Sequence, residues 1–435
     1  MPKTTHSLPR RAYRATRSLM RRWRKDAVAP GERAGRAKAS GIKVAFIYGE
    51  KRTATGADHI NKLMAEALAA RGARVRAFYP RIQLRGMPQH LRGIINILFF
   101  HSLLEHKDEI LKNDIIQGTT YTPLPFLTFD TPIVSHFGST TRGFLNATPA
   151  TLRLPANERA WYRGFFKSGI IPELDFKTFR PLEDSADIEE LVALRADACV
   201  ATSHKVKEEL MAAGVSEEKI HVIHNAIEDY WFATTPPQVP APPHLVFLGR
   251  LGGDVFTLKL KGFARLVNLY NAFPDTPKTT VCMTVNKPLK EWMRVAFSNH
   301  HLFVNLRKDL IPGVLQPRYG SILLLTSRYE GFSLSLIEGM SQGLVPVAFP
   351  VGVVPELIQN GVNGYIVETT EEAEARVREL LADEPKRLAM ARAARESVVQ
   401  FKSERIAEEL LALYYSLKAQ RRAKNAPQKP EEPAG

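Results

Sequence analysis

Two short apolar runs that flank a glycine turn most constrain the fold of this chain. The first, Ser321 to Thr326, reads S-I-L-L-L-T, and the second runs from Leu344 to Phe349. Short aliphatic runs of this kind are typical of strands buried on both faces of a parallel sheet. Glu330 and Gly331 lie just after the first run and predict a turn at the end of that strand.

The residues between the two runs predict a helix. Ser333 is expected to cap its N-terminus, the helix is expected to continue to about Gln342, and Gly343 is expected to end it. The segment is therefore a strand-turn-helix-strand unit. Its helix N-terminus lies at the carboxyl end of a strand, where free N–H groups and the helix dipole favour a bound anion.

Two carboxylates, Glu330 and Glu338, belong to this unit. An ionised carboxylate beside an anion is repelled, whereas it accepts hydrogen bonds from sugar hydroxyls. The pair thus indicates a ligand that carries both a phosphate and a sugar. For two glutamates eight residues apart, taken alone, a solvent-exposed helix face is the favoured explanation, and the flanking sequence changes that preference.

The surrounding sequence resembles a known family. It reads E-G-F-S-L-S-L-I-E-G-M-S-Q-G-L-V-P-V and continues as V-G-V-V-P-E-L-I-Q-N-G-V-N-G-Y-I-V. This resembles the E-x7-E region of retaining, nucleotide-sugar-dependent glycosyltransferases (glycosyl transferases group 1, or family 4-like). The resemblance implies an α/β architecture with two Rossmann-like domains facing across a cleft, the GT-B fold. It covers about residues 41 to 418.

The resemblance also implies roles for residues of the second domain. Glu330 would hold sugar hydroxyls and Glu338 the ribose, with the N–H groups of Gly331, Phe332 and Ser333 near the donor phosphates. Backbone at Leu306, after an expected strand, would contact the nucleotide base. Glu356, in G-V-V-P-E, is a secondary candidate near the donor and equally a helix-start acid.

Two cations suit a diphosphate. Arg250 follows the expected strand His244 to Leu248, and Lys261 precedes Gly262 at an expected helix start. An arginine fork and a lysine point charge both bind phosphate oxygens. The insertion before Lys261 makes Lys259 a competing candidate.

The first domain resembles the family more loosely than the second does. His136 ends an expected strand and matches the family's strand-end histidine near the donor's anomeric carbon. Gly56 matches one of two adjacent glycines in a loop over the cleft, while Ala57 replaces the other. The aromatic and basic stretch of residues 142–180 predicts either packing or an acceptor or membrane-facing surface.

Composition sets the domain boundaries. Five prolines in residues 233–243 exclude helix and central strand, so this stretch is the expected linker. It separates an acceptor domain, residues 41–232, from a donor domain, residues 244–400. A helix at residues 401–418 would cross back to the first domain, and residues 419–435 are expected to form a disordered tail.

The net charge of +15 is concentrated in residues 1–40, which hold 12 Lys and Arg against Asp26 and Glu32. Leu19 and Trp23 would share one face of a basic amphipathic helix. This predicts either contact with an anionic membrane surface or a solubilising arm; nucleic acid is disfavoured because no recognition motif follows. The chain also lacks an apolar signal core, which predicts a cytoplasmic location, peripheral at the inner face of the membrane if the tail binds it.

The sequence therefore predicts an enzyme that transfers a sugar, with retention, from a nucleotide diphosphate sugar such as a UDP-sugar. The acceptor would be a glycan, a lipid or a cell-surface polymer. No D-x-D motif follows a strand, so no metal and no further cofactor are expected. A non-catalytic sugar-nucleotide binder, a GT-B epimerase and a basic adaptor protein are the alternatives.

Overall fold

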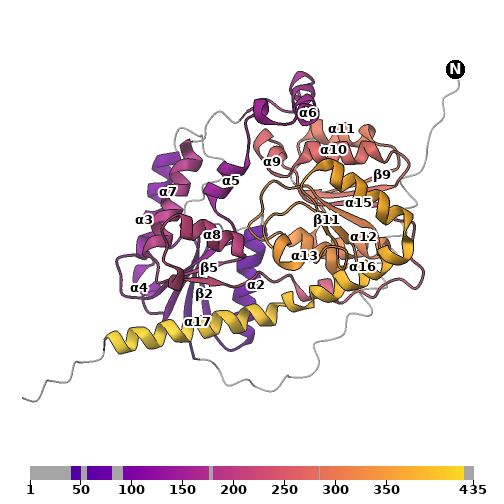
Figure 1. Ribbon diagram of the computed structural model, residues 1–435. Coiled ribbons are helices and arrows are strands. Elements are labelled where there is room, and N and C mark those ends of the chain that lie inside the picture. The colour runs from indigo at the N-terminus through magenta and orange to yellow at the C-terminus, as the bar shows by residue number, and fades with distance from the viewer. Residues whose placement is uncertain (1–40, 50–55, 81–91, 176–179, 284, 426–435) are drawn as a thin grey trace, which may run out of the picture. The chain divides into compact units, whose positions relative to one another are not determined.

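The computed structural model describes residues 41–49, 56–80, 92–175, 180–283 and 285–425. The basic amphipathic helix predicted within residues 1–40 lies outside the described residues, as do residues 50–55 of the loop before Gly56. The described chain contains two parallel sheets, and each has six strands (Figure 1).

The first sheet has the strand order β2-β1-β3-β4-β5-β6, and every neighbouring pair is parallel. Its strands are β1 Lys43–Ile47, β2 Arg74–Phe78, β3 Ile115–Thr119, β4 Ile133–Phe137, β5 Ala198–Ala201 and β6 Ile220–Val222.

The second sheet has the order β12-β11-β10-β7-β8-β9 and is also parallel throughout. Its strands are β7 Leu245–Arg250, β8 Lys278–Met283, β9 His300–Val304, β10 Ile322–Leu325, β11 Val345–Ala348 and β12 Tyr365–Ile366.

Helices connect the consecutive strands of each sheet except β3 and β4, which are joined by a loop with the short 3-10 helix Leu124–Phe126. In the first domain they are α2 Gly56–Ala70, α3 Arg92–Leu104, α4 Lys107–Ile110, α5 Thr141–Ala147, α6 Ala156–Lys167, α7 Arg180–Arg195 and α8 His204–Ala212. In the second they are α9 Val255–Leu260, α10 Phe263–Ala272, α11 Lys287–Ala296, α12 Ile311–Leu315, α13 Leu334–Ser341, α14 Val354–Leu357, α15 Thr370–Ala382 and α16 Glu384–Ser397, followed by α17 Ser403–Lys424. Two parallel α/β sheets confirm the predicted pair of Rossmann-like domains.

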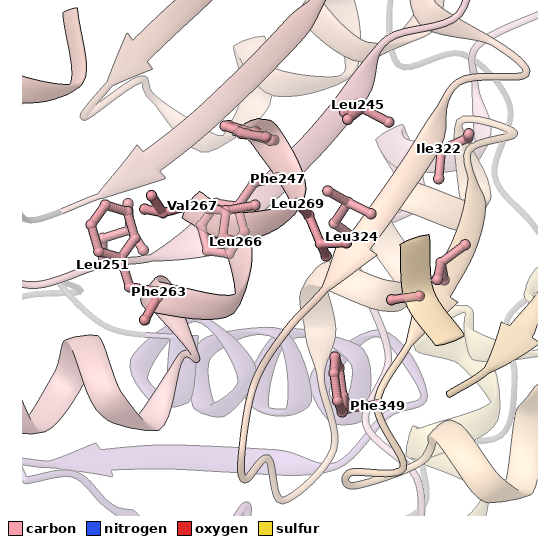
Figure 2. Close-up of a cluster of buried hydrophobic side chains, with 14 of the residues drawn as sticks. Leu245, Phe247, Leu251, Phe263, Leu266, Val267, Leu269, Ile322, Leu324 and Phe349 are labelled. Atoms are coloured by element: carbon pink, nitrogen blue, oxygen red, sulfur yellow. The ribbon is translucent and has the colours of Figure 1, made fainter. Parts of the chain in front are cut away.

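Strand β7 shows why its sequence is almost continuously apolar. Successive side chains point to opposite faces of a sheet, and both faces here are covered. Leu245 and Phe247 pack into one hydrophobic cluster together with residues of α10, whereas Val246 and Leu248 pack into the cluster on the other face. Figure 2 shows Leu245 and Phe247 with Leu266 and other members of the first cluster.

Part of the aromatic stretch at residues 142–180 packs with the second domain. Tyr162 and Phe165 of α6 are buried in the same cluster as Phe263 and Leu266 of α10. The Tyr162 hydroxyl donates to the carbonyl of Leu258 at 3.2 Å. The packing interpretation therefore holds for these rings.

The last helix packs on the first domain. Ile406, Leu410 and Tyr414 of α17 join the cluster formed by β1 and α2, and α17 runs beside α2 in Figure 1. The helix continues to Lys424, so the prediction of a disordered tail from residue 419 is wrong for residues 419–424. The run K-A-Q-R-R-A-K explains the extension, because these are strong helix formers and basic side chains stabilise a helix C-terminus.

Residues 233–243 contain neither helix nor strand. Among the described residues, none of the helices combines the length and the apolar character that crossing a membrane would need.

Candidate functional site

The turn after β10 brings two predicted site residues into direct contact. Lys261 Nζ lies 2.6 Å from Glu330 Oε1, and the Ser327 hydroxyl donates to the same oxygen at 2.7 Å. Both ionic side chains are largely buried, at 19% and 14% exposure. Lys261 is the C-cap residue of α9 and directly precedes Gly262, the N-cap of α10 with a φ of +60°, whereas Glu330 lies three residues before Ser333, the N-cap residue of α13.

Lys259 is engaged elsewhere. Its ammonium lies 2.6 Å from Asp175 Oδ1 and donates to the carbonyl of Pro149 at 3.1 Å. Its side chain is only 2% exposed. Of the two competing lysines, Lys261 is therefore the one placed at the turn, while Lys259 connects α9 to the segments before and after α6 through Pro149 and Asp175.

Arg250 is the last residue of β7 and is exposed to solvent. No ion pair of Arg250 with another described residue is observed, in contrast to Lys259 and Lys261. A guanidinium left free at the carboxyl end of a strand retains all of its donors for a ligand.

The turn itself is pressed against the first domain. A Cβ atom added to Gly331 would lie 1.9 Å from the carbonyl oxygen of Gly138, in the loop after β4. The Ser203 hydroxyl donates to the carbonyl of Gly331 at 2.5 Å, and the hydroxyl of Tyr329 accepts from the backbone N–H of Thr140 at 3.0 Å. Only glycine fits at residue 331, so elements of both domains bound the turn.

Ser333 occupies the N-cap position of α13 but does not cap it. Its φ of +83° and ψ of +73° place it in the left-handed region, and its side chain makes no capping bond. The predicted side-chain cap is therefore wrong: a capping residue normally has extended backbone angles, which Ser333 does not have. The Ser333 hydroxyl is buried without a hydrogen-bond partner among the described residues. Such an orphaned group is unusual and costs stability unless a ligand satisfies it.

Glu338 lies on the buried side of α13 and is held by a lysine. Lys308 Nζ is 3.0 Å from Glu338 Oε1 and 2.9 Å from Glu228 Oε2. Burial raises the pKa of Glu338, and the Lys308 cation opposes that rise. Burial by itself would lower the pKa of Lys308, but the two carboxylates raise it overall. Leu306, two residues before Lys308, packs partly buried against the adjoining apolar cluster.

His136 lies near the carboxyl end of β4, as predicted, but it is only 2% exposed. Its Nε2 is buried and has no hydrogen-bond partner among the described residues. Burial lowers the pKa of His136 to about 4, so the ring is neutral near pH 7. A neutral imidazole can donate or accept one hydrogen bond at such a nitrogen.

The remaining predicted residues are placed as follows. Gly56 begins α2, directly after residues outside the described part of the chain. The Phe332 side chain is buried against the rings of Phe401 and His224, so only its backbone can face a ligand. Glu356 binds His204 and His224 and makes no observed contact with Lys261 or Glu330.

Sequence reasoning missed several side chains around the turn. Ser327, Tyr329 and Lys308 hold the glutamates or the loop in place, and Ser203 and Glu209 reach them from the first domain. Only Ser327 and Tyr329 could have been suspected from the sequence, because they lie within three residues of Glu330. The other contacts join residues more than a hundred positions apart or, for Lys308 and Glu338, on separate elements.

The chain matches two family models, one in each domain. Residues 259–397 match "Glycosyl transferases group 1", and residues 172–229 match "Glycosyltransferase Family 4". A sucrose-phosphate synthase from Thermosynechococcus elongatus aligns with a TM-score of 0.67 at 16% identity, over 87% of this chain and 100% of that chain. The chain has the GT-B fold. Anabaena Alr3699/HepE in complex with UDP and glucose aligns with a TM-score of 0.59 at 17% identity, over 86% of this chain and 100% of that chain.

Sequence relatives of this GT-B chain match over shorter stretches. An N-acetyl-alpha-D-glucosaminyl L-malate synthase from Bacillus anthracis is 40% identical over 100 residues, which is 22% of this chain and 26% of the relative. A lipopolysaccharide 1,6-galactosyltransferase from Salmonella typhimurium is 26% identical over 186 residues, or 39% of this chain and 48% of the relative. The chain thus spans no more than about half the length of these two relatives.

Proposed function

We propose that this GT-B chain is a glycosyltransferase that moves a sugar from a nucleotide diphosphate sugar to an acceptor, with retention of configuration. The observation that carries the proposal is the contact of Glu330 with both Lys261 and Ser327, just before the N-terminus of α13. A cation, a carboxylate and a helix N-terminus gathered in one turn suit a ligand with both a charged diphosphate and sugar hydroxyls.

The leaving group would be stabilised by positive charge. When the bond between the anomeric carbon and the diphosphate breaks, negative charge develops on the departing oxygen. Arg250, free at the end of β7, and Lys261 are the cations assigned to it, with N–H groups from Gly331 to Ser333 as further donors. Preorganised charges and dipoles of this kind usually contribute more to lowering the barrier of an enzymatic reaction than any other single effect.

The carboxylates would hold the uncharged parts of the donor. Glu330 is assigned to hydroxyls of the transferred sugar and Glu338 to the ribose. Lys308 positions Glu338 by pairing with one of its carboxylate oxygens. The backbone at Leu306 is proposed to contact the base. Gly56 is proposed to belong to the loop that lies near the donor phosphates. The buried Nε2 of His136 and the hydroxyl of Ser333, both without partners among the described residues, are the groups that a bound donor would satisfy.

The donor is proposed to be a UDP-sugar and the acceptor a glycan, a lipid or a cell-surface polymer. UDP and glucose occupy the structurally similar Alr3699/HepE, and lipopolysaccharide appears in the name of one relative. We propose a cytoplasmic protein whose basic residues 1–40 contact an anionic membrane surface. No metal is assigned to the transfer, because cations of the chain itself are assigned to the diphosphate.

Nucleotide release from a panel of UDP-, GDP- and ADP-sugars tests this proposal. We expect slow hydrolysis of one donor by the wild type and at least about a 100-fold loss in Arg250→Ala and Glu330→Gln. Arg294→Ala and Glu291→Gln are matched controls, since these residues form an exposed pair with each other on α11. Absence of release from every donor, together with absence of thermal stabilisation by UDP, GDP or ADP, would refute the proposal.

A further inference from the structure

A second cluster of side chains, formed by His204, His224 and Glu356, joins the two domains. His204 begins α8 and His224 follows β6, both in the first domain, whereas Glu356 lies in α14 of the second. The two ring nitrogens, His204 Nδ1 and His224 Nε2, each lie 2.8 Å from Glu356 Oε2. The three ligand atoms that these residues offer all lie within 4.8 Å of one another.

The surroundings fix the direction of these groups. The backbone N–H of His204 donates to Glu356 Oε1 at 2.7 Å, which leaves Oε2 facing both imidazoles. The ring of His224 packs against both Phe332 and Phe401, with centroid distances of 5.9 and 5.7 Å. A carboxylate oriented through its other oxygen and a ring held by packing are the supports that metal ligands typically have.

We propose that His204, His224 and Glu356 form a binding site for a divalent transition-metal ion of the zinc type. Two imidazole nitrogens and one carboxylate oxygen are a common three-residue set for zinc, with water as the fourth ligand. The exposure of the His204 side chain, 63%, leaves room for that water. The three proposed ligands are not among the residues assigned to the donor, although the His224 ring contacts the side chain of Phe332, and the proposal does not rest on the transferase proposal.

To admit the ion, each ring nitrogen must move away from the carboxylate oxygen, and the two ring nitrogens, which lie within 4.8 Å of each other, must take the same spacing. Metal–ligand bonds of roughly 2.0–2.1 Å in tetrahedral geometry place ligand atoms about 3.3 Å apart. The present separation of 2.8 Å from each nitrogen to the oxygen must therefore grow by about half an ångström. Each neutral imidazole keeps its proton by moving it to the other ring nitrogen, so the lone pair can face the metal.

The ion would act as a clamp between the domains. Glu356 belongs to the second domain and both histidines to the first, so the bound ion cross-links the two sheets through side chains. The chain's two cysteines, Cys199 and Cys282, do not compete for it, because both are buried. Burial also raises the pKa of each thiol to about 12, which disfavours the thiolate that binds zinc.

The test is a zinc titration of the full-length, tag-free protein near neutral pH, with a competing zinc-responsive dye. We expect the wild type to bind one ion and its unfolding temperature to rise with zinc and fall with a chelator. His204→Ala, His224→Ala and Glu356→Gln should each weaken binding by more than the 10–100-fold typical of supporting residues. His101→Ala, an exposed histidine on α3, is the matched control and should bind as the wild type does.

His204→Ala removes an exposed ring and Glu356→Gln keeps the acceptor of the backbone bond, so both variants are expected to fold. Far-UV circular dichroism checks this for each variant. If the wild type binds no zinc, or if the folded His204→Ala and Glu356→Gln proteins bind it with wild-type affinity, the proposed site does not exist. These results leave the donor-release assay unaffected, so the two proposals fail independently.

Discussion

Replacing Lys308 by methionine should show how much the stability of the fold depends on the one cation that pairs with Glu228 and Glu338. Lys308 is 16% exposed and bridges Glu338, at 8%, and Glu228, at 19%. Methionine keeps most of the apolar stem but leaves both carboxylates without their cation. Removing one member of a buried ion pair typically destabilises a protein by about 3–5 kcal/mol.

We expect the lower end of that range, about 3 kcal/mol, since Glu228 still reaches water and accepts from Trp231 Nε1 at 3.2 Å. For a domain of this size the loss corresponds to a fall in unfolding temperature of about 6–12 °C. The deficit should depend on pH. Glu338 already has a raised pKa in the folded state, and losing Lys308 raises it further. Such a carboxyl group destabilises the fold above its unfolded-state pKa, so the deficit should grow as the pH rises and shrink as it falls.

Thermal unfolding at about pH 5 and pH 8 measures both effects. The double variant Lys308→Met/Glu338→Gln removes the buried charge as well and should recover at least half of the loss. Lys207→Met is the control, because Lys207 pairs with the exposed Glu217 and should cost less than about 1 kcal/mol. A loss in Lys308→Met no larger than in Lys207→Met, or equal at both pH values, would contradict this description of the cluster.

Three further outcomes follow from single residues. Gly331→Ala places a Cβ 1.9 Å from the Gly138 carbonyl oxygen and should abolish thermal stabilisation by the donor nucleotide; unchanged stabilisation would refute the close contact. Ser333→Gly removes the unpartnered hydroxyl and also relieves a left-handed φ of +83°, so in urea unfolding it should be more stable by about 1 kcal/mol than Ser333→Ala, which removes only the hydroxyl. His136 has a pKa of about 4 in the fold against 6.5 in its usual state, so stability should fall as the pH drops from 6.5 to 4. His136→Gln, which does not titrate, should reduce this loss by up to roughly 3 kcal/mol, measured by unfolding at each pH.

The architecture was predictable from the sequence because short apolar runs and helix-ending glycines mark the strands and helices locally. Apolar runs such as Ser321 to Thr326 are buried on both faces of their sheet, and Gly343, which follows the helix after the glycine turn, has the expected positive φ of +72°. The ends of the helices were less predictable from the sequence. The helix of residues 403–424 outlasts its apolar pattern, since charged helix formers extend it without burying any further surface.

The candidate site was only partly predictable. Glu330 was named because it follows a buried strand, and Lys261 because it precedes a glycine at an expected helix start, where a cation suits a diphosphate. Their direct contact, and the separate partner of Lys259, depend on how α9 and α10 pack and left no local signal. Ser333 misled the prediction, since residue type favours a cap while the conformation is set by distant packing, in which the Val353 N–H donates to the carbonyl of Phe332.

Contacts between the domains were not predictable at all. Tyr329 meets Thr140, and Glu356 meets His204 and His224, across more than a hundred residues of chain. A single sequence gives residue types and spacing along the chain, but such contacts depend on the relative placement of two separately folded sheets. The zinc-type cluster is therefore visible only in the structure.

The most direct test of the proposed donor site compares the two neighbouring lysines. Lys261→Met and Lys259→Met remove the same charge two residues apart, and nucleotide release from the donor found in the panel gives kcat/KM for each. We expect at least about a 100-fold loss in Lys261→Met and a value within a few-fold of wild type in Lys259→Met. Equal losses in both variants, or a larger loss in Lys259→Met, would contradict the assignment of Lys261 and Glu330 to the donor site.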